Sequence, residues 1–224
     1  MKLGDHNIKP TKIICLGRNY SEHAKEMKEQ VPKNPVFFVK TVNTLVTDGN
    51  PIIYPRMLYY NQDYNRVDHE VELAFIISQV CKNIQIENAY EYIIGYSIFL
   101  DITARKMQIS DRNINLPWYR SKNFDTFGPI GPRIVSCEEI EDPHNLNIQL
   151  KINGKIRQQS NTKHMLFKIP EILAYLSSFI TLTPGDIVAT GTPSGVGPIQ
   201  PGDIIEASIE HIGTITHKVI LEEE

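Results

Sequence analysis

The stretch that decides the fold is Asp68-His69-Glu70-Val71-Glu72-Leu73-Ala74-Phe75-Ile76-Ile77. It alternates at first and then becomes apolar and β-branched, which predicts a strand that enters a core. Residues two apart on a strand share a face, so Glu70 and Glu72 point the same way. Two neighbouring carboxylates repel each other unless a cation lies between them. A hard divalent ion such as Mg²⁺ meets that need, while a solvated strand face is the simpler alternative.

The rest of the chain predicts a mainly β (α+β) fold with short helices. Further strands are expected over residues 12–17, 36–40, 95–101, 146–152, 204–210 and 214–220. Asn153-Gly154 predicts a tight hairpin, because both central residues of such a turn need positive φ. Helices are expected over residues 21–27, 87–93 and 170–179, the last with a core-facing stripe of Ile172, Leu173, Leu176 and Phe179. No linker or low-complexity stretch divides the chain, so we predict one domain over residues 1–224.

Composition excludes several classes of partner. The net charge is −3 and the chain has no basic block, which argues against a nucleic-acid surface. No apolar run reaches the length of a membrane span, and the N-terminus has no signal-peptide pattern. Cys15, Cys81 and Cys137 are odd in number and widely spaced in apolar settings. They are interpreted as free thiols of a reducing compartment, so we expect a cytoplasmic protein without a membrane partner.

Asp101 ends the predicted strand 95–101 and supplies a third carboxylate. It could simply cap the segment that follows. It could also complete a set of oxygen ligands with Glu70 and Glu72 that leaves positions open for water or substrate. No matching cluster of His and Cys accompanies these acids, which weighs against zinc. The sequence therefore favours Mg²⁺ or Mn²⁺.

His23 and Glu26 lie three residues apart on the predicted helix 21–27, which Asn19 is expected to cap, and so share a face. A carboxylate beside an imidazole orients the ring and supports its positive form, which suits a general base. A solvated helix face is the alternative. The helix has little apolar surface, so we expect it to be weakly anchored.

Two further segments carry polar chemistry. Lys122 lies in an aromatic and basic stretch, residues 118–129, and is interpreted as pointing at an anionic substrate. A stacking patch for nucleic acid is disfavoured by the acidic balance of the chain. The glycine-rich segment 190–197 matches neither the P-loop nor the dinucleotide-binding pattern. Its backbone N–H groups could still cradle a carboxylate.

Several short motifs occur in a fixed order along the chain. They are Gly17-Arg18-Asn19-Tyr20-x-x-His23, Glu70-x-Glu72, Gly95-Tyr96 running to Asp101, Thr103-Ala104-Arg105, Lys122-x-Phe124-Asp125-Thr126, Asn153-Gly154, Gln158, Asn161-Thr162, Pro184-Gly185-Asp186 and Thr190-Gly191-Thr192-Pro193-x-Gly195-Val196-Gly197. Together they resemble the fumarylacetoacetate hydrolase family from residue 13 to 219. The resemblance is greatest to the short branch with acylpyruvases and oxaloacetate decarboxylases or tautomerases.

The resemblance implies a mixed β-sandwich or β-roll, a homodimer, and Mg²⁺ or Mn²⁺ held by Glu70, Glu72 and Asp101. It also implies that residues 19–30 form a short lid helix that carries His23 and Glu26 as catalytic residues. It further implies substrate contacts from Arg18, Arg105, Gln108, Lys122 and Thr192.

Three features depart from the family pattern. Thr41 follows Lys40 where Pro is common, and Lys106 follows Arg105 where an acid is common. The segment 56–67 is longer than usual. It is either an inert surface insertion or a segment that reshapes the choice of substrate.

These residues predict an enzyme that acts on small 2-oxo (di)acids. Loss of CO₂ from oxaloacetate, or of an acyl group from an acylpyruvate, leaves a metal-bound enolate that the cation and Lys122 stabilise. Hydrolysis of a C–C bond needs an attacking water, activated by His23 and Glu26, whereas decarboxylation does not. The alternatives are a keto–enol tautomerase, an isomerase of a longer 2-oxo diacid, and a non-catalytic dimeric binding protein.

Overall fold

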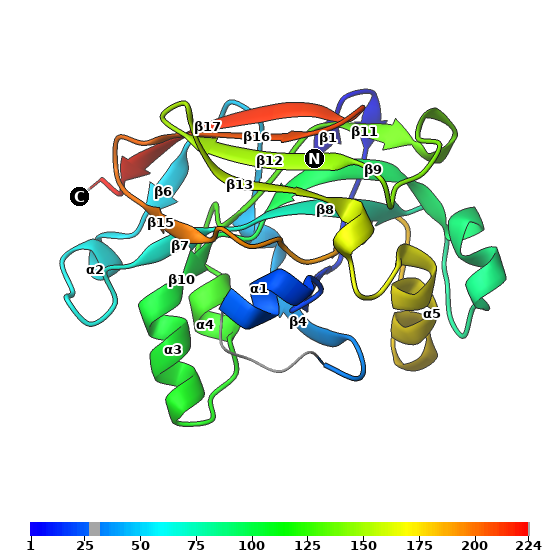
Figure 1. The fold of residues 1–224 in the computed structure, drawn as a ribbon, viewed down its shortest axis with the longest axis horizontal. Coiled ribbons are helices and arrows are strands. Elements are labelled where there is room, and N and C mark those ends of the chain that lie inside the picture. Colours follow the sequence, from blue (N-terminus) through cyan, green and yellow to red (C-terminus); the bar gives the residue numbers. More distant parts are fainter. Residues whose placement is uncertain (27–31, 224) are drawn as a thin grey trace.

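Two sheets form the body of the protein. The computed structural model describes residues 1–26 and 32–223, with backbone alone for residues 23–25 (Figure 1). The seven-stranded sheet has the order β4 (Val36–Lys40), β3 (Ile13–Gly17), β14 (Ile187–Ala189), β8 (Val71–Ile77), β9 (Ile93–Leu100), β11 (Gly128–Ser136), β5 (Leu45–Thr47). The five-stranded sheet has the order β13 (Lys155–Asn161), β12 (Asn147–Ile152), β16 (Ile204–Ile209), β17 (Gly213–Leu221), β6 (Ile52–Tyr54). Figure 1 shows the second sheet stacked over β8 and β9.

Smaller elements complete the fold. A three-stranded sheet joins β10 (Thr103–Ala104), β7 (Val67–His69) and β15 (Gly197–Ile199), and a two-stranded one joins β1 (Lys2–Leu3) and β2 (His6–Asn7). The α-helices are α1 (Ser21–Glu26), α2 (Arg56–Tyr59), α3 (Arg105–Asn113), α4 (Tyr119–Lys122) and α5 (Ile169–Phe179). The 3₁₀ turns are η1 (Val42–Thr44), η2 (Ile86–Tyr92), η3 (Cys137–Glu139) and η4 (Thr162–His164). Among the helices of the described residues, none combines the length and apolar character that a membrane crossing requires.

Alternation along β8 sorts its side chains to two faces, as the sequence predicts. Leu73, Phe75 and Ile77 belong to the large core between the two main sheets. Ala74 and Ile76 lie on the opposite face, in a smaller apolar cluster with residues of β1 and β3. Glu72 therefore projects from the face that lies away from the five-stranded sheet. Figure 1 shows α1, α3 and α4 on this side of the molecule.

The predicted hairpin and the cysteines are found as expected. Asn153 and Gly154 have φ of 52° and 75° and connect β12 to β13. Cys15 and Cys81 are buried, Cys137 is half-buried, and all three are free thiols. The mainly β architecture with short helices is confirmed.

Three local predictions are wrong. The helix expected over residues 87–93 is the 3₁₀ turn η2, and Ile93 already pairs with Ile77 in the β8–β9 ladder. Phe179 is 59 % exposed, because it packs at the surface against the rings of Phe37 and Tyr175.

Asn19 does not cap α1 but ties the end of β3 to two distant segments. Its Nδ2 donates to the carbonyl oxygens of Thr190 (2.8 Å) and Phe167 (3.1 Å), and its Oδ1 accepts from the backbone N–H of Phe167.

Gly95 lies on β9 where β11 leaves no room for a side chain. An added Cβ there would lie 2.1 Å from the carbonyl oxygen of Val135 and 2.9 Å from Ile134 Cγ2. We expect Gly95→Ala to lower the free energy of unfolding by about 1–3 kcal/mol, because the backbone of β11 must shift. Urea unfolding measures the effect. Gly197→Ala is the matched control, since its Cβ would meet His69 Nε2 at an ordinary 3.6 Å. Equal stability of the two variants would contradict the prediction.

Candidate metal centre and substrate pocket

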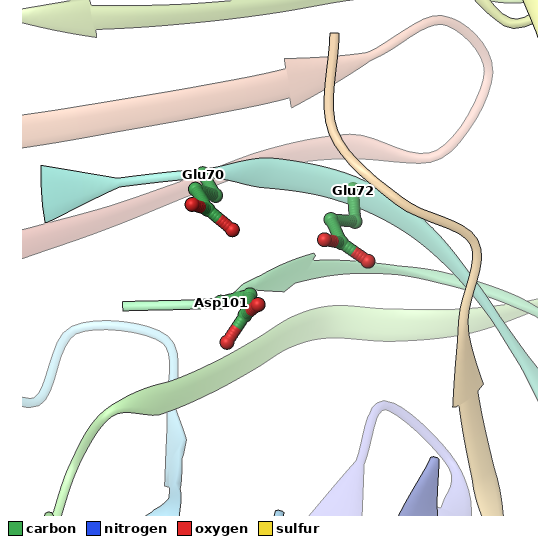
Figure 2. A group of neighbouring side chains, drawn as sticks. All are labelled: Glu70, Glu72 and Asp101. Atoms are coloured by element: carbon green, nitrogen blue, oxygen red, sulfur yellow. The ribbon is translucent and has the colours of Figure 1, made fainter. Parts of the chain in front are cut away.

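Three carboxylates meet at the ends of two adjacent strands. Glu70 lies at the break between β7 and β8, Glu72 on β8, and Asp101 directly after β9. Each offers an oxygen, and these oxygens lie within 4.8 Å of one another (Figure 2). The three residues are 5 %, 1 % and 0 % exposed. The backbone N–H of Asp101 donates to the carbonyl of Glu70 at 2.9 Å, which fixes the two strand ends relative to each other.

Buried cationic side chains surround the carboxylates. Lys122 Nζ donates to Glu70 Oε2 at 3.1 Å and also to Asp101 Oδ2. Lys40 Nζ donates to the other oxygen of Asp101, Oδ1, at 2.8 Å. Arg105 donates to Glu70 Oε1 through its Nη2. Glu72 accepts a bond of 2.8 Å from the backbone N–H of Gly191.

Burial and crowding shift the titration of this cluster. Burial, together with the nearby charges of Asp101 and Glu70, raises the pKa of Glu72 well above its usual range. Burial lowers the pKa of Lys40, although Asp101 opposes this shift. Burial also disfavours the charged form of Lys122, but Asp101 and Glu70 outweigh it and the pKa of Lys122 is raised. Lys122 therefore stays an ammonium, and the negative charge on Glu72 is the one most in need of a counter-ion.

The donor set fits a hard divalent cation. Carboxylate oxygens are the ligands that Mg²⁺ and Mn²⁺ prefer, and three of them leave further positions of an octahedron for water or substrate oxygens. A cation there would relieve the repulsion that raises the pKa of Glu72. Glu70, Glu72 and Asp101 are the residues that would hold it.

A pocket opens beside the carboxylates. It is lined by Leu16, Gly17, Arg18, Phe38, Glu70, Glu72, Arg105, Gln108, Ile109, Arg112, Trp118, Lys122 and Thr192. All five residues predicted as substrate contacts, Arg18, Arg105, Gln108, Lys122 and Thr192, are in this lining. The structure thus brings together the predicted substrate contacts and two of the three carboxylates, Glu70 and Glu72. Arg18 enters the pocket from a left-handed backbone conformation (φ 63°), which is costly for a residue other than glycine.

Helix α3, which was not predicted, positions Arg105 and Gln108. Arg105 Nη1 donates to Gln108 Oε1 at 2.6 Å, one helical turn further on. Arg105 Nε donates to Asp68 Oδ2 at 2.9 Å, and the backbone N–H of Arg105 donates to the carbonyl of Arg66 at 2.7 Å. Asp68 is fully buried and also accepts from Arg66 Nε at 2.8 Å. Asp68 therefore holds the guanidinium of Arg105 in its position beside Glu70.

Two of the three departures from the family pattern, Lys106 and Thr41, make hydrogen bonds in the structure, and Lys106 contacts the third, the segment 56–67. Lys106 Nζ donates to the carbonyl of Gln62 (2.7 Å) and to Asn65 Oδ1 (2.8 Å), so this lysine holds the long segment 56–67 against α3. The backbone N–H of Thr41, which a proline would lack, donates to Asn123 Oδ1 at 2.5 Å. Asn123 follows Lys122 directly, so this contact helps to fix the end of α4 that carries the pocket lysine.

Gln158 connects β8, the strand that carries Glu72, to the loop that carries Thr192. It was not predicted as a site residue. Its Oε1 accepts from the backbone N–H of Val71 (3.1 Å) and contacts His69 Nδ1 (3.0 Å). Its Nε2 donates to Thr192 Oγ1 (2.7 Å) and to the carbonyl of Pro193 (2.9 Å). Thr192 Oγ1 in turn donates to the carbonyl of Val71 at 2.9 Å. A sequence motif alone could mark Gln158 but not this long-range role.

The glycine-rich segment 190–197 does bind carboxylates, and they belong to the protein itself. The N–H of Gly191 donates to Glu72, and the N–H of Gly195 donates to both carboxylate oxygens of Glu26 at 3.1 and 3.2 Å. Glu26, at the end of α1, is thereby attached to the loop that carries Thr192. His23 lies on α1, but its side chain is outside the described residues, as is the part of the predicted lid helix from residue 27 to 30. The pairing of His23 with Glu26 therefore stays a prediction.

Several known proteins are similar to this chain over most of its length. The mitochondrial oxaloacetate tautomerase FAHD1 of Arabidopsis thaliana is 42 % identical over 209 residues, which are 93 % of this chain and 91 % of the relative. The crystal structure of 5-carboxymethyl-2-hydroxymuconate delta-isomerase from Mycobacterium smegmatis superposes with a TM-score of 0.84. It is 38 % identical, with 97 % of this chain and 81 % of the other covered.

A second similar structure contains ligands. Fumarylpyruvate hydrolase from Pseudomonas aeruginosa, in complex with Mn²⁺ and pyruvate, has a TM-score of 0.89 at 31 % identity, with 99 % and 95 % of the two chains covered. The family model for the fumarylacetoacetate (FAA) hydrolase C-terminal domain matches residues 12–220. The chain therefore belongs to the fumarylacetoacetate hydrolase family, whose named members include hydrolases, isomerases and tautomerases.

Proposed function

We propose that this protein is a divalent-metal-dependent enzyme that acts on small 2-oxo acids through their enolates, with hydrolysis of an acylpyruvate C–C bond as its main reaction. The observation that carries the proposal is one pocket that combines carboxylates able to hold a metal ion with Lys122, Arg105 and Gln108. Carboxylates that hold a hard cation, next to cations that bind an anion, match a substrate with a carboxylate and an adjacent keto oxygen. The fumarylpyruvate hydrolase with Mn²⁺ and pyruvate supports both the metal and the substrate class.

The side chains have distinct roles in this proposal. A bound Mg²⁺ or Mn²⁺ would supply Lewis acidity at the keto group. Arg105 and Gln108, held together by a hydrogen bond of 2.6 Å, would bind and orient the substrate carboxylate. Lys122 would stabilise the negative charge that develops on the enolate oxygen, since it stays protonated beside Asp101 and Glu70. His23, oriented by Glu26, would take a proton from the attacking water.

A second activity on the same site is keto–enol tautomerisation or double-bond isomerisation. The named relatives favour it, because one is an oxaloacetate tautomerase and one is an isomerase. Both reactions pass through an enolate or dienolate and move a proton, between carbon and oxygen in the tautomerisation and between two carbons in the isomerisation, and neither needs an attacking water. Oxaloacetate decarboxylation likewise needs no attacking water. A homodimer and a cytoplasmic location remain predictions of the sequence.

Replacing His23 separates hydrolysis from the reactions without water. We expect His23→Ala to lower acetylpyruvate hydrolysis by about a hundredfold or more, the usual effect of removing a general base. Oxaloacetate decarboxylation should fall much less, because it needs no activated water. Steady-state assays of both reactions with saturating Mg²⁺ measure the two losses.

His6→Ala is the control, since His6 is exposed on β2. Equal losses of the two activities in His23→Ala would show that α1 serves a step common to both, such as closing the pocket. The water-activating role of His23 would then be wrong.

A further inference from the structure

One face of α3 runs along the pocket from its floor to its mouth. Arg105, Gln108, Ile109 and Arg112 all line the pocket, and their spacing of three, four and seven places them on one side of a helix. Arg105 and Gln108 are 4 % and 7 % exposed, Ile109 is 39 % exposed, and Arg112 is exposed. The helix thus carries an inner cation beside Glu70 and an outer cation at the rim. Seven residues of helix separate them by about 10 Å along the axis.

Ile109 places an apolar side chain on α3 between the two cations, and further apolar side chains line the same pocket. Ile109, Phe38, Leu16 and Trp118 contribute to the lining. Phe38 and Trp118 meet edge to face with ring centroids 5.5 Å apart, and Trp118 packs so closely on Gly17 that a Cβ there would lie 3.2 Å from its ring. The pocket therefore offers a polar inner end, an apolar middle and a cationic rim. A molecule that matches all three parts is a hydrocarbon chain with an anionic group at each end.

We propose that Arg112 is a specificity-determining residue that binds the distal carboxylate of an extended 2-oxo diacid. The inference rests on the proposed function, which places the 2-oxo acid group at the inner end, beside the carboxylates, Arg105 and Lys122. The planar fork of an arginine matches a carboxylate with two parallel hydrogen bonds. Oxaloacetate is too short to reach from the inner end to the rim. A diacid with several more carbons between its carboxylates spans the apolar middle and reaches Arg112.

Two acylpyruvates provide the sharpest test. Fumarylpyruvate and acetylpyruvate have the same scissile bond, but only fumarylpyruvate carries a distal carboxylate. We expect Arg112→Gln to lower kcat/KM for fumarylpyruvate by about tenfold to a hundredfold, mainly through KM, as for the loss of a charged hydrogen-bonded pair. The kcat/KM for acetylpyruvate should stay unchanged. Arg112→Lys should restore part of the loss, because it keeps the charge without the fork.

A binding measurement tests the same point without turnover. Titration calorimetry compares 2-oxoadipate, a 2-oxo diacid, with pyruvate, a 2-oxo monoacid. Arg112→Gln should weaken 2-oxoadipate binding and leave pyruvate binding unchanged. Arg133→Gln is the control, since Arg133 is a half-exposed arginine on β11 that is absent from the pocket lining.

The outcomes separate this inference from the proposed function. Turnover of acetylpyruvate by the unchanged protein supports the proposed function, whatever Arg112 does. Losses in Arg112→Gln that are equal for both substrates, or absent for fumarylpyruvate, overturn the role of Arg112 alone. Failure of every 2-oxo acid to bind or react overturns the proposed function and this inference with it.

Discussion

Replacing Glu72 with Gln is expected to abolish metal binding almost completely. The affinity for Mn²⁺ should fall by more than about a hundredfold, since even partners that only orient metal ligands change affinity by about tenfold to a hundredfold. Glu72 is 1 % exposed, and burial with Asp101 and Glu70 nearby raises its pKa. The carboxylate is therefore crowded by like charge until a cation relieves it. Glutamine keeps an oxygen for the N–H of Gly191 but removes that charge.

The stability of the variant distinguishes metal loss from misfolding. In EDTA, Glu72→Gln should be at least as stable as the unchanged protein, because it removes a buried charge in a crowded cluster. Saturating Mn²⁺ should stabilise the unchanged protein, as a ligand of the folded state alone does, and should not stabilise the variant. Calorimetric titration with Mn²⁺ and thermal unfolding measure the two effects. Glu141→Gln, at an exposed position, is the control. An unchanged Mn²⁺ affinity in Glu72→Gln, or full activity in EDTA, would show that these carboxylates hold no catalytic metal.

The cluster of three carboxylates was predictable from the sequence because its geometry is local. Glu70 and Glu72 share a strand face by the period of two, and the apolar run 73–77 fixes which face is buried. Asp101 follows the strand that pairs with β8, so a third carboxylate next to them needs only strand pairing. These features depend on few residues, which lie close together in the sequence or on neighbouring strands. The ordered motifs added the predicted substrate contacts Arg18, Arg105, Gln108, Lys122 and Thr192, all of which line the pocket.

Other parts of the site depend on contacts between distant segments. Helix α3 buries Gln108 and Asp111 along with Met107, so it lacks the apolar stripe that identifies a helix in a sequence. Asn19 carries a helix-cap side chain, yet it bonds to Phe167 and Thr190, far along the chain. Phe179 follows the helical period of α5 but lies where the core has ended. Propensity and period describe what a segment prefers, and tertiary contacts decide which preference is used.

Lys122 is the residue whose loss should affect every reaction of this site. Its Nζ lies 3.1 Å from Glu70 Oε2 and 2.7 Å from Thr103 Oγ1, and it lines the pocket. Hydrolysis, decarboxylation and tautomerisation all develop negative charge on the same enolate oxygen. We expect Lys122→Met to lower acetylpyruvate hydrolysis and oxaloacetate decarboxylation alike, by about a hundredfold to a thousandfold, as for the loss of one donor to an oxyanion. Steady-state assays at saturating Mg²⁺ compare the two losses.

The metal affinity of the same variant should not fall. The Lys122 ammonium donates to Glu70 and Asp101, so it competes with a divalent cation for their oxygens, and its removal should leave Mn²⁺ binding equal or tighter. Lys40→Met is the matched control, because Lys40 is another buried lysine that donates a hydrogen bond to Asp101 but is not in the pocket lining. It should lower stability, since it removes one partner of a buried pair, and reduce turnover far less. If Lys122→Met lost hydrolysis alone, Lys122 would act on the water step rather than on the enolate. If it lost metal binding in parallel with activity, Lys122 would serve to assemble the carboxylates.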